Sequence, residues 1–281
     1  MIEVRNVSQS YTKSGTDKTL DDVSLIVREN TITALVGANG AGKSTLLGAM
    51  NNLIQTMSGE ILIDGVNVRK IKPSEVAKKI AFLKQTQQIS IRITVNDLVE
   101  FGRFPHCGGR LKDIDKQKVN EALDYMMVTD LRERFLDELS GGQRQRAFIA
   151  MILAQDTPYI FLDEPLNNLD IKYSVEMMKI VKKLVTELNK TIVIVMHDIN
   201  FASAYAGYIV AMKNGRILND GEPNKMITNE VLNPTFDHDF HILQHDGKRV
   251  CLFFDDDDLC PPQACHPSQE ECDLSFIKCS Q

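Results

Sequence analysis

An eight-residue segment, 37–44, limits the possible folds of this chain more than any other feature of its sequence. It reads Gly-Ala-Asn-Gly-Ala-Gly-Lys-Ser and fits the pattern G-x-x-x-x-G-K-[ST]. An apolar run, 32–36, precedes it and a helical pattern, 45–51, follows it, so we expect a turn from a buried strand into a helix. Glycines let backbone N–H groups curl around an anion, and a helix N-terminus adds positive charge. The segment predicts a phosphate-binding loop in which Lys43 binds the β- and γ-phosphates and Ser44 ligates Mg²⁺.

A second apolar run, 159–162, ends in two adjacent carboxylates, Asp163 and Glu164. Carboxylates are costly at the end of a buried strand unless they meet a cation. By itself, this pattern is equally typical of a metal site and of an ordinary strand end. Downstream of a phosphate-binding loop, it indicates that Asp163 ligates Mg²⁺ and that Glu164 polarises the attacking water as general base.

A third motif, Leu-Ser-Gly-Gly-Gln at 139–143, precedes an amphipathic helical pattern, 144–154. Ser140 and Gln143 have the spacing of a capping box, in which each side chain bonds the other residue's backbone N–H. An ordinary capped helix would explain these two residues, but not two helix-weakening glycines in the first turn. Gly141 and Gly142 leave the backbone bare, so we interpret this helix start as a second phosphate-binding site.

Leu-Ser-Gly-Gly-Gln is similar to the signature motif of ABC (ATP-binding cassette) ATPases, and the chain resembles that family over about residues 1–222. The resemblance implies that Tyr11 stacks on adenine and that Gln85 is the glutamine that senses Mg²⁺ and faces a permease. It also implies that His197 contacts the γ-phosphate. The segment 168–170 is similar to the family's D-loop, although Asn168 stands where a small residue is usual.

Together, the motifs and the resemblance define one set of expected site residues. The catalytic residues are Glu164, His197 and Gln85; the ATP-binding residues are Tyr11, Gly37, Ala38, Asn39, Gly40, Ala41, Gly42, Lys43, Ser44, Thr45, Ser140, Gly141, Gly142, Gln143 and Asp170; and the Mg²⁺ ligands are Ser44, Gln85 and Asp163. In this family the signature of one copy covers the phosphate-binding loop of another. The resemblance therefore implies a head-to-tail dimer with ATP between the copies.

Apolar patterns predict the fold class. Alternating residues at 2–7, 20–27 and 61–68, with Asp-Gly at 64–65, indicate an N-terminal antiparallel β subdomain. Short apolar runs at 32–36, 159–162 and 191–196 alternate with helical patterns, which is typical of an α/β fold with a parallel or mixed sheet core. We expect a helical subdomain inserted at about 88–155. The family resemblance makes this an ABC cassette of the P-loop NTPase class, covering 1–222.

The end of the chain, after about residue 222, matches the family resemblance poorly. Residues 223–254 are predicted to form an extension with a hairpin of 240–244 and 249–254, and 255–281 an acidic, cysteine-containing, poorly ordered tail. Three histidines (238, 241 and 245) and five late cysteines raise the alternative of a metal site. The cysteines have no C-x-x-C pair and 255–258 lacks the glycine and spacing of a calcium loop, so we favour a solvated tail.

Composition limits the function classes. The net charge of −6 and the pI of about 5.6 disfavour a nucleic-acid partner. No apolar run reaches the roughly 20 residues that span a bilayer, and the N-terminus lacks a signal-peptide pattern. We therefore expect a cytoplasmic protein, and the family resemblance implies that it is bound at the cytoplasmic face of the cell membrane through integral permease subunits.

The chain most resembles the ATPases of iron(III)-siderophore importers of the ferrichrome, catecholate and petrobactin types. The resemblance rests on Thr-Val-x-x-Leu-Val at 94–99 and the following Gly-Arg at 102–103. It implies that 86–109 docks on the permease and that a substrate-binding protein takes part indirectly. The alternatives are another metal-chelate, cobalamin or haem importer, an exporter, a non-transport ABC ATPase, and a regulatory module without turnover.

Overall fold

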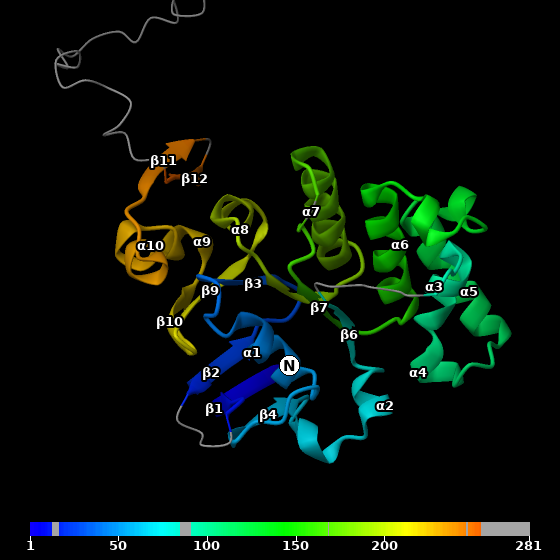
Figure 1. The fold of residues 1–281 in the computed structure, drawn as a ribbon, viewed down its shortest axis with the longest axis horizontal. Helices are drawn as coiled ribbons and strands as arrows, with labels where there is room; N and C mark the ends of the chain where they lie inside the picture. The colour runs from blue at the N-terminus through cyan, green and yellow to red at the C-terminus, as the bar shows by residue number, and fades with distance from the viewer. Residues whose placement is uncertain (13–16, 85–90, 168, 246, 254–281) are drawn as a thin grey trace, which may run out of the picture.

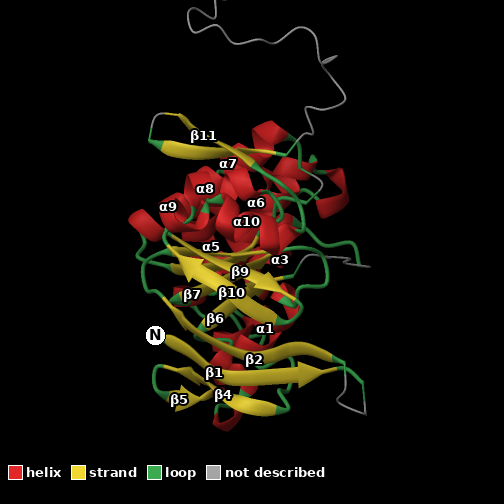
Figure 2. Cartoon of the chain, turned by 90° about the vertical axis from the view of Figure 1, so that its left-hand side faces the viewer, coloured by secondary structure: helices red, strands yellow, loops and turns green. Residues whose placement is uncertain are grey.

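The computed structural model describes residues 1–12, 17–84, 91–167, 169–245 and 247–253. Viewed from the side, the chain stacks in layers: an antiparallel sheet, one helix, a larger mixed sheet and a layer of helices (Figures 1 and 2). The predicted fold class, a mixed sheet core with an antiparallel β subdomain and additional helices, is confirmed.

The first sheet contains four strands in the order β2-β1-β4-β5. Its strands are β1 (Ile2–Ser10), β2 (Lys18–Val27), β4 (Ser58–Ile63) and β5 (Val66–Asn67). The turn between β4 and β5 is the predicted Asp-Gly pair, with φ of 52° at Asp64 and 78° at Gly65. These left-handed conformations match the twist of a tight hairpin.

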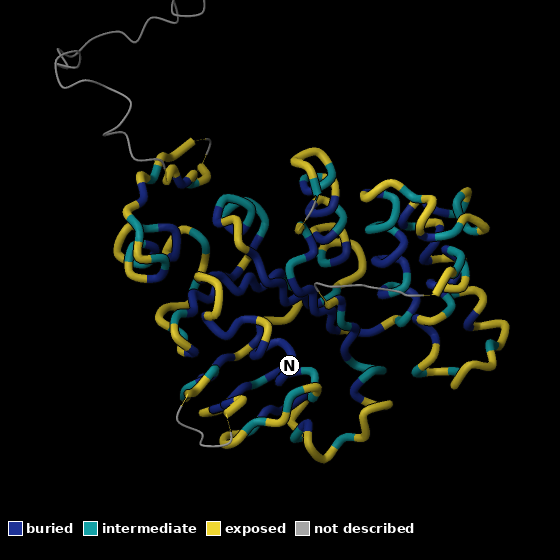
Figure 3. The backbone as a smooth tube through the Cα atoms, viewed as in Figure 1, coloured by how far each residue is buried: buried dark blue, intermediate teal, exposed yellow. Residues whose placement is uncertain are grey.

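The second sheet has six strands in the order β10-β9-β3-β8-β7-β6. They are β3 (Ile32–Val36), β6 (Ile80–Leu83), β7 (Tyr159–Asp163), β8 (Thr191–Val195), β9 (Tyr208–Lys213) and β10 (Arg216–Gly221). All neighbours are parallel except β9 and β10. Every residue of β3, β7 and β8 is buried, as expected for parallel strands covered on both faces (Figure 3).

Helix α1 (Lys43–Met50) lies between the two sheets. Leu46, Leu47 and Met50 are fully buried in one cluster with side chains of both sheets. A helix that is buried on nearly all sides is held in place by its surroundings. The segment 37–42, which joins β3 to α1, therefore sits at the end of a central strand on a rigid support.

The other face of the larger sheet carries most of the helices. They are α3 (Val95–Phe101), α4 (Phe104–Cys107), α5 (Asp113–Tyr125), α6 (Gly141–Ala154), α7 (Ile171–Thr186) and α8 (Ile199–Tyr205), with 3-10 turns η2 (Thr129–Leu131) and η3 (Leu136–Glu138). Residues 91–154 form α3 to α6 and the two 3-10 turns, with one isolated bridge between Thr94 and Phe135. A short connection, η1 (Val68–Lys70) and α2 (Pro73–Val76), links the two sheets.

The C-terminal elements are α9 (Pro223–Met226), α10 (Asn229–Phe236), and a hairpin of β11 (His241–His245) and β12 (Lys248–Leu252). The division of the chain at about 222 and 254 stays a prediction, and 255–281 lies outside the described residues. Within the described part of the chain, no helix is both long and apolar enough to cross a bilayer.

Candidate nucleotide-binding site

The loop 37–42 is shaped by Gly37 and Gly42, whose surroundings leave no room for a side chain. Gly37 and Gly42 have φ of 142° and 99°. A Cβ at Gly37 would lie 2.1 Å from the Met212 carbonyl oxygen, and one at Gly42 would lie 2.6 Å from that of Thr19. Gly40, with φ of 79°, faces open space, and Ala38 and Asn39 beside it are exposed. The loop thus packs its base tightly and leaves its tip free for a ligand.

The start of α1 has no side-chain cap, because its N-cap residue is Gly42. The first N–H groups of a helix have no partner within the helix and carry positive partial charge. Ala41 is buried behind them, and its carbonyl accepts a hydrogen bond from Gly215 in the turn between β9 and β10. These features fit a triphosphate, because an anion can reach the bare N–H groups of a firmly backed loop.

Lys43 is buried and donates to the carbonyl oxygens of Gly37 and Ala38, at 2.7 and 2.9 Å. Burial lowers the pKa of Lys43, although the carboxylates of Glu164 and Asp163 oppose this shift. The ammonium group therefore lies inside the loop and faces the carboxylates at the end of β7. It is held in place by hydrogen bonds that a phosphate could replace.

Ser44 and Asp163 meet although they are far apart in the sequence. The Ser44 hydroxyl donates to Oδ1 of Asp163 at 2.8 Å. Burial raises the pKa of Asp163, and the hydrogen bond from Ser44 opposes this shift. A hydroxyl and a costly buried carboxylate in contact are a suitable pair of oxygen ligands for Mg²⁺. Among the described residues, no group of three or more His, Cys, Asp or Glu side chains could hold a metal ion.

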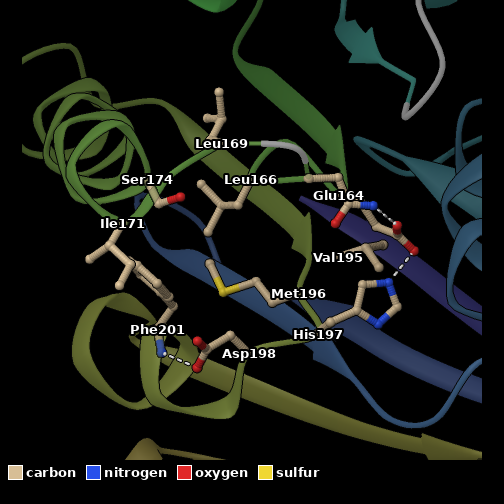
Figure 4. A pocket seen from close by; sticks show the side chains of 11 residues that line it. Glu164, Leu166, Leu169, Ile171, Ser174, Val195, Met196, His197, Asp198 and Phe201 are labelled. Carbon is tan, nitrogen blue, oxygen red and sulfur yellow. Dashed lines mark hydrogen bonds and ion pairs between the residues drawn. The ribbon is translucent and has the colours of Figure 1, made fainter. Parts of the chain in front are cut away.

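Glu164 and His197 form the second contact at this edge of the sheet. Nε2 of His197 lies 2.5 Å from Oε1 of Glu164 (Figure 4). Glu164 has φ of 51°, which is uncommon for a residue with a side chain and marks a sharp turn directly after β7. Asn167, which the sequence motifs did not single out, donates to Oε2 of Glu164 at 2.5 Å. Two neighbours thus orient both carboxylate oxygens.

A pocket of about 240 Å³ opens beside this pair. Figure 4 shows Met196, His197 and Asp198 on one side and Leu166, Leu169 and Ile171 on the other. Glu164 and His197 lie at one end of the pocket, and Ser174 and Asp198 add polar groups elsewhere in its lining. Most of the other lining residues are apolar, so the carboxylate and the imidazole lie at the edge of a pocket of mixed character.

The predicted capping box at the start of α6 is confirmed. Ser140 accepts from the backbone N–H of Gln143 at 3.3 Å, and the Gln143 side chain accepts from the N–H of Ser140 at 3.0 Å. Both views place α6 in the helical layer, away from α1 (Figures 1 and 2). The structure therefore does not bring the signature helix together with the phosphate-binding loop of the same chain.

The two signature glycines differ in their surroundings. A Cβ at Gly141 would meet nothing within 4 Å, whereas one at Gly142 would lie 2.5 Å from the ring of Tyr173. Close packing of α6 on α7 thus gives a reason for Gly142 that is independent of any ligand. Gln145 adds to this contact by donating to the carbonyl of Pro165, in the turn after β7, at 3.1 Å.

The structure places the remaining predicted site residues in different settings. Tyr11 is exposed, and its hydroxyl lies 3.3 Å from Oγ1 of Thr45, so these two candidates lie together at the start of α1. Asp170 is the N-cap of α7 and accepts from the N–H of Tyr173 at 2.9 Å, a local structural role. Gln85 and Asn168 lie outside the described residues.

The segment 91–109 differs in part from the expected docking surface. Phe101 and Phe104 are 59% and 57% exposed, but Arg103 is only 6% exposed. Its guanidinium lies 2.9 Å from Asp115 and donates to the Ala154 carbonyl at 2.8 Å. The Gly-Arg pair therefore packs α3 and α4 against α5 and α6, while the aromatic Phe101 and Phe104 and the basic Arg92 and His106 are exposed.

Comparisons with known proteins agree with this geometry. The family described as ABC transporter matches residues 20–167. The petrobactin import ATP-binding protein YclP of Bacillus subtilis (strain 168) is 54% identical over 90% of this chain and 100% of that protein. The iron(3+)-hydroxamate import ATP-binding protein FhuC of the same organism is 36% identical over 84% of this chain and 89% of that protein.

Solved structures show the same relationship. One is a dimeric ATP-binding cassette in a post-hydrolysis state bound to ADP and Pi, with a TM-score of 0.69 and 30% identity. The match covers 79% of this chain and 99% of that one. The resemblance expected from the sequence motifs is confirmed: the chain belongs to the ABC transporter family, as an ATP-binding cassette.

Proposed function

We propose that this chain is the ATP-binding and ATP-hydrolysing subunit that powers import of an iron-siderophore complex through a membrane permease. The observation that carries the proposal is the 2.8 Å contact between Ser44 and Asp163. It joins the phosphate-binding loop to the end of β7, where the next residue, Glu164, is paired with His197. Binding and hydrolytic groups therefore meet at one edge of the sheet.

In this proposal, the loop 37–42 and the first turn of α1 bind the phosphates of ATP, and Tyr11 stacks on adenine. Lys43 moves its hydrogen bonds from the Gly37 and Ala38 carbonyls to the β- and γ-phosphates. Ser44 and Asp163, with Gln85, would hold Mg²⁺, which neutralises negative charge on the phosphates. The buried Lys43 and the helix N-terminus supply further positive charge from the protein itself.

Glu164 acts as the general base. Its carboxylate accepts a proton from water while Asn167 fixes one oxygen and His197 the other. His197, 37% exposed at the pocket edge, is placed to turn from Glu164 toward the γ-phosphate.

A second copy of the chain would complete the site. The signature helix start, Ser140–Gln143, lies in the helical layer away from α1, so it can reach a phosphate only on another copy. The relative solved with ADP and Pi is itself dimeric. We infer a head-to-tail dimer in which Gly141, the open glycine of the signature, approaches the γ-phosphate.

The permease is the other proposed partner. Phe101 and Phe104 are large, exposed aromatic side chains on adjacent short helices, which suits a protein interface. Docking at these helices would hold the chain at the cytoplasmic face of the membrane. The substrate-binding protein would take part only through the permease.

The proposed cargo rests on relatives. Several similar proteins are named as petrobactin import ATP-binding proteins, and others as hydroxamate or enterobactin transport ATP-binding proteins. Because cargo is selected by other subunits, the ATPase itself carries little information about the chelate. A siderophore of the petrobactin type has the strongest support, since the 54% identical relative carries that name.

Uptake measurements test this function. Cells that lack the chain should lose uptake of radioactive iron supplied as ferric petrobactin. The wild-type chain should restore uptake, and the Glu164→Gln variant should not. If iron uptake is unchanged without the chain while uptake of cobalamin or haem falls, the proposed cargo is wrong.

A further inference from the structure

The C-terminal hairpin is bound to helix α8 by a two-way contact between a side chain and the backbone. The Asn200 amide donates to the Cys251 carbonyl at 3.1 Å, and its oxygen accepts from the Cys251 N–H at 2.7 Å. One turn further along α8, the Ser203 hydroxyl donates to the Arg249 carbonyl at 2.6 Å. Strand β12 is thus held along its backbone, as it would be by a neighbouring strand.

The hairpin is also fixed to the body of the protein. The Arg249 guanidinium donates to the Ile227 carbonyl at 2.7 Å, beside α9. The Cys251 side chain is buried, and burial, together with the nearby Asp198 carboxylate, raises the pKa of its thiol to about 11. The face of the hairpin that carries Cys251 therefore packs against the body of the protein, so the hairpin can act as a fixed support for α8.

Helix α8 leads directly back to the proposed catalytic pair. Asp198 is its N-cap and accepts from the N–H groups of Asn200 and Phe201, at 2.7 and 3.2 Å. The residue before Asp198 is His197, which contacts Glu164 at 2.5 Å. Figure 4 shows His197, Asp198 and Phe201 along the same side of the pocket. Only two residues separate His197 from the side chain that holds the hairpin.

Helix α8 has seven residues, and a helix of that length needs tertiary contacts to keep its position. Ile199 and Ala202 anchor its inner face to the core. Asn200 and Ser203 face the hairpin, so the hairpin supplies the outer support. Displacement of a catalytic group by about 1 Å can cost roughly 100-fold in rate. The outer contact therefore bears on how accurately His197 meets its partner.

We propose that Asn200 is a positioning residue for His197, acting by joining α8 to the C-terminal hairpin. The proposal deepens the function proposed above and rests on it for the role of His197. It assigns a part in ATP hydrolysis to a segment, β11–β12, that lies far in sequence from every nucleotide-binding motif. Asn200 acts through His197 and does not itself touch ATP.

The test compares Asn200→Ala with a matched control, Asn233→Ala, in the full chain. Asn233 also accepts from a backbone N–H, that of Phe240 at 3.2 Å, and donates to Asp239 at 2.6 Å, but it lies on α10. Steady-state ATP hydrolysis gives kcat and KM. The imidazole resonances of His197, assigned by their loss in His197→Ala, report its position independently of activity.

We expect Asn200→Ala to lower kcat about tenfold, with KM changed less than about twofold, and to shift the His197 ring resonances. Asn233→Ala should change neither. Unchanged resonances in Asn200→Ala, or an equal loss of kcat in Asn233→Ala, would overturn the proposal. If His197→Ala keeps full activity, the proposed role of His197 in hydrolysis is wrong, and the resonances still decide whether Asn200 positions the ring.

Discussion

Replacing Gly142 with alanine should destabilise the protein, whereas the same change at the adjacent Gly141 should not. A methyl group at 142 would lie 2.5, 2.8 and 3.0 Å from three ring carbons of Tyr173. Favourable carbon contacts begin at about 3.5 Å, so the ring or one of the helices must move by about 1 Å. At Gly141 the methyl group would enter open space.

The magnitude follows from two opposing effects. Alanine in place of glycine within a helix is favourable by about 0.5–1 kcal/mol, and both variants gain part of this because both residues belong to α6. Overpacking costs about 1–3 kcal/mol and applies only at Gly142. The difference in unfolding free energy between the variants should therefore be about 1–3 kcal/mol. For a protein of this size, that corresponds to melting temperatures that differ by roughly 2–6 °C.

Thermal unfolding of the two variants without nucleotide gives this difference directly. The comparison separates packing from ATP binding, because no ligand is present. Tyr173→Ala removes the ring and should abolish most of the cost of Gly142→Ala, so the two changes should be strongly non-additive. If Gly142→Ala melts at or above the temperature of Gly141→Ala, the packing argument is refuted.

Two further predictions concern the phosphate-binding loop. Burial raises the pKa of Asp163, so the stability that this residue contributes is complete below the unfolded carboxyl pKa and is lost as pH rises through the folded value. The Asp163→Asn variant keeps an oxygen that can accept from Ser44. It should therefore raise the melting temperature near neutral pH but not in acid. A lower melting temperature near neutral pH would contradict this expectation. Lys43→Ala should weaken Mg-ATP binding roughly 10- to 100-fold by calorimetry, from the loss of charge-assisted hydrogen bonds, and an unchanged affinity would rule out the assigned role of Lys43.

Features that depend on local chemistry could be predicted from the sequence. The turn at Asp64-Gly65 and the capping box at Ser140 each depend on a few neighbouring residues, and the structure contains both. The strands β3, β7 and β8 were recognisable because each is a continuous apolar run in a βαβ pattern. Each of these structures is determined mainly by residues within one short segment of the sequence.

Short or weakly patterned strands could not be predicted. The four residues of β6 are too few to distinguish a strand from a helix by periodicity. The sequence contains a second Asp-Gly pair, at 220–221, but both residues belong to β10 and pair with Val210 and Ile209. The chain reverses instead at Asn214 and Gly215, which have φ of 50° and 77°.

Contacts between residues that are far apart in the sequence could not be predicted either. Nothing in the local pattern shows that Gly142 packs against Tyr173, or that Arg103 is buried against Asp115. The pairing of Ser44 with Asp163 was expected only because both were assigned to one metal ion. The left-handed backbone of Glu164 and the bond from Asn167 likewise appear only in three dimensions.

Hydrolysis of ATP by the Glu164→Gln variant tests the central claim most directly. Glutamine can still accept a hydrogen bond but cannot take a proton from water, so Mg-ATP should bind while turnover falls about 100- to 10,000-fold. Asn167→Ala is a suitable companion, since it removes one contact to Glu164 and leaves the base in place, and its loss should be smaller. Turnover by Glu164→Gln at a rate near that of the wild type would contradict the assignment of the base and with it the proposed mechanism.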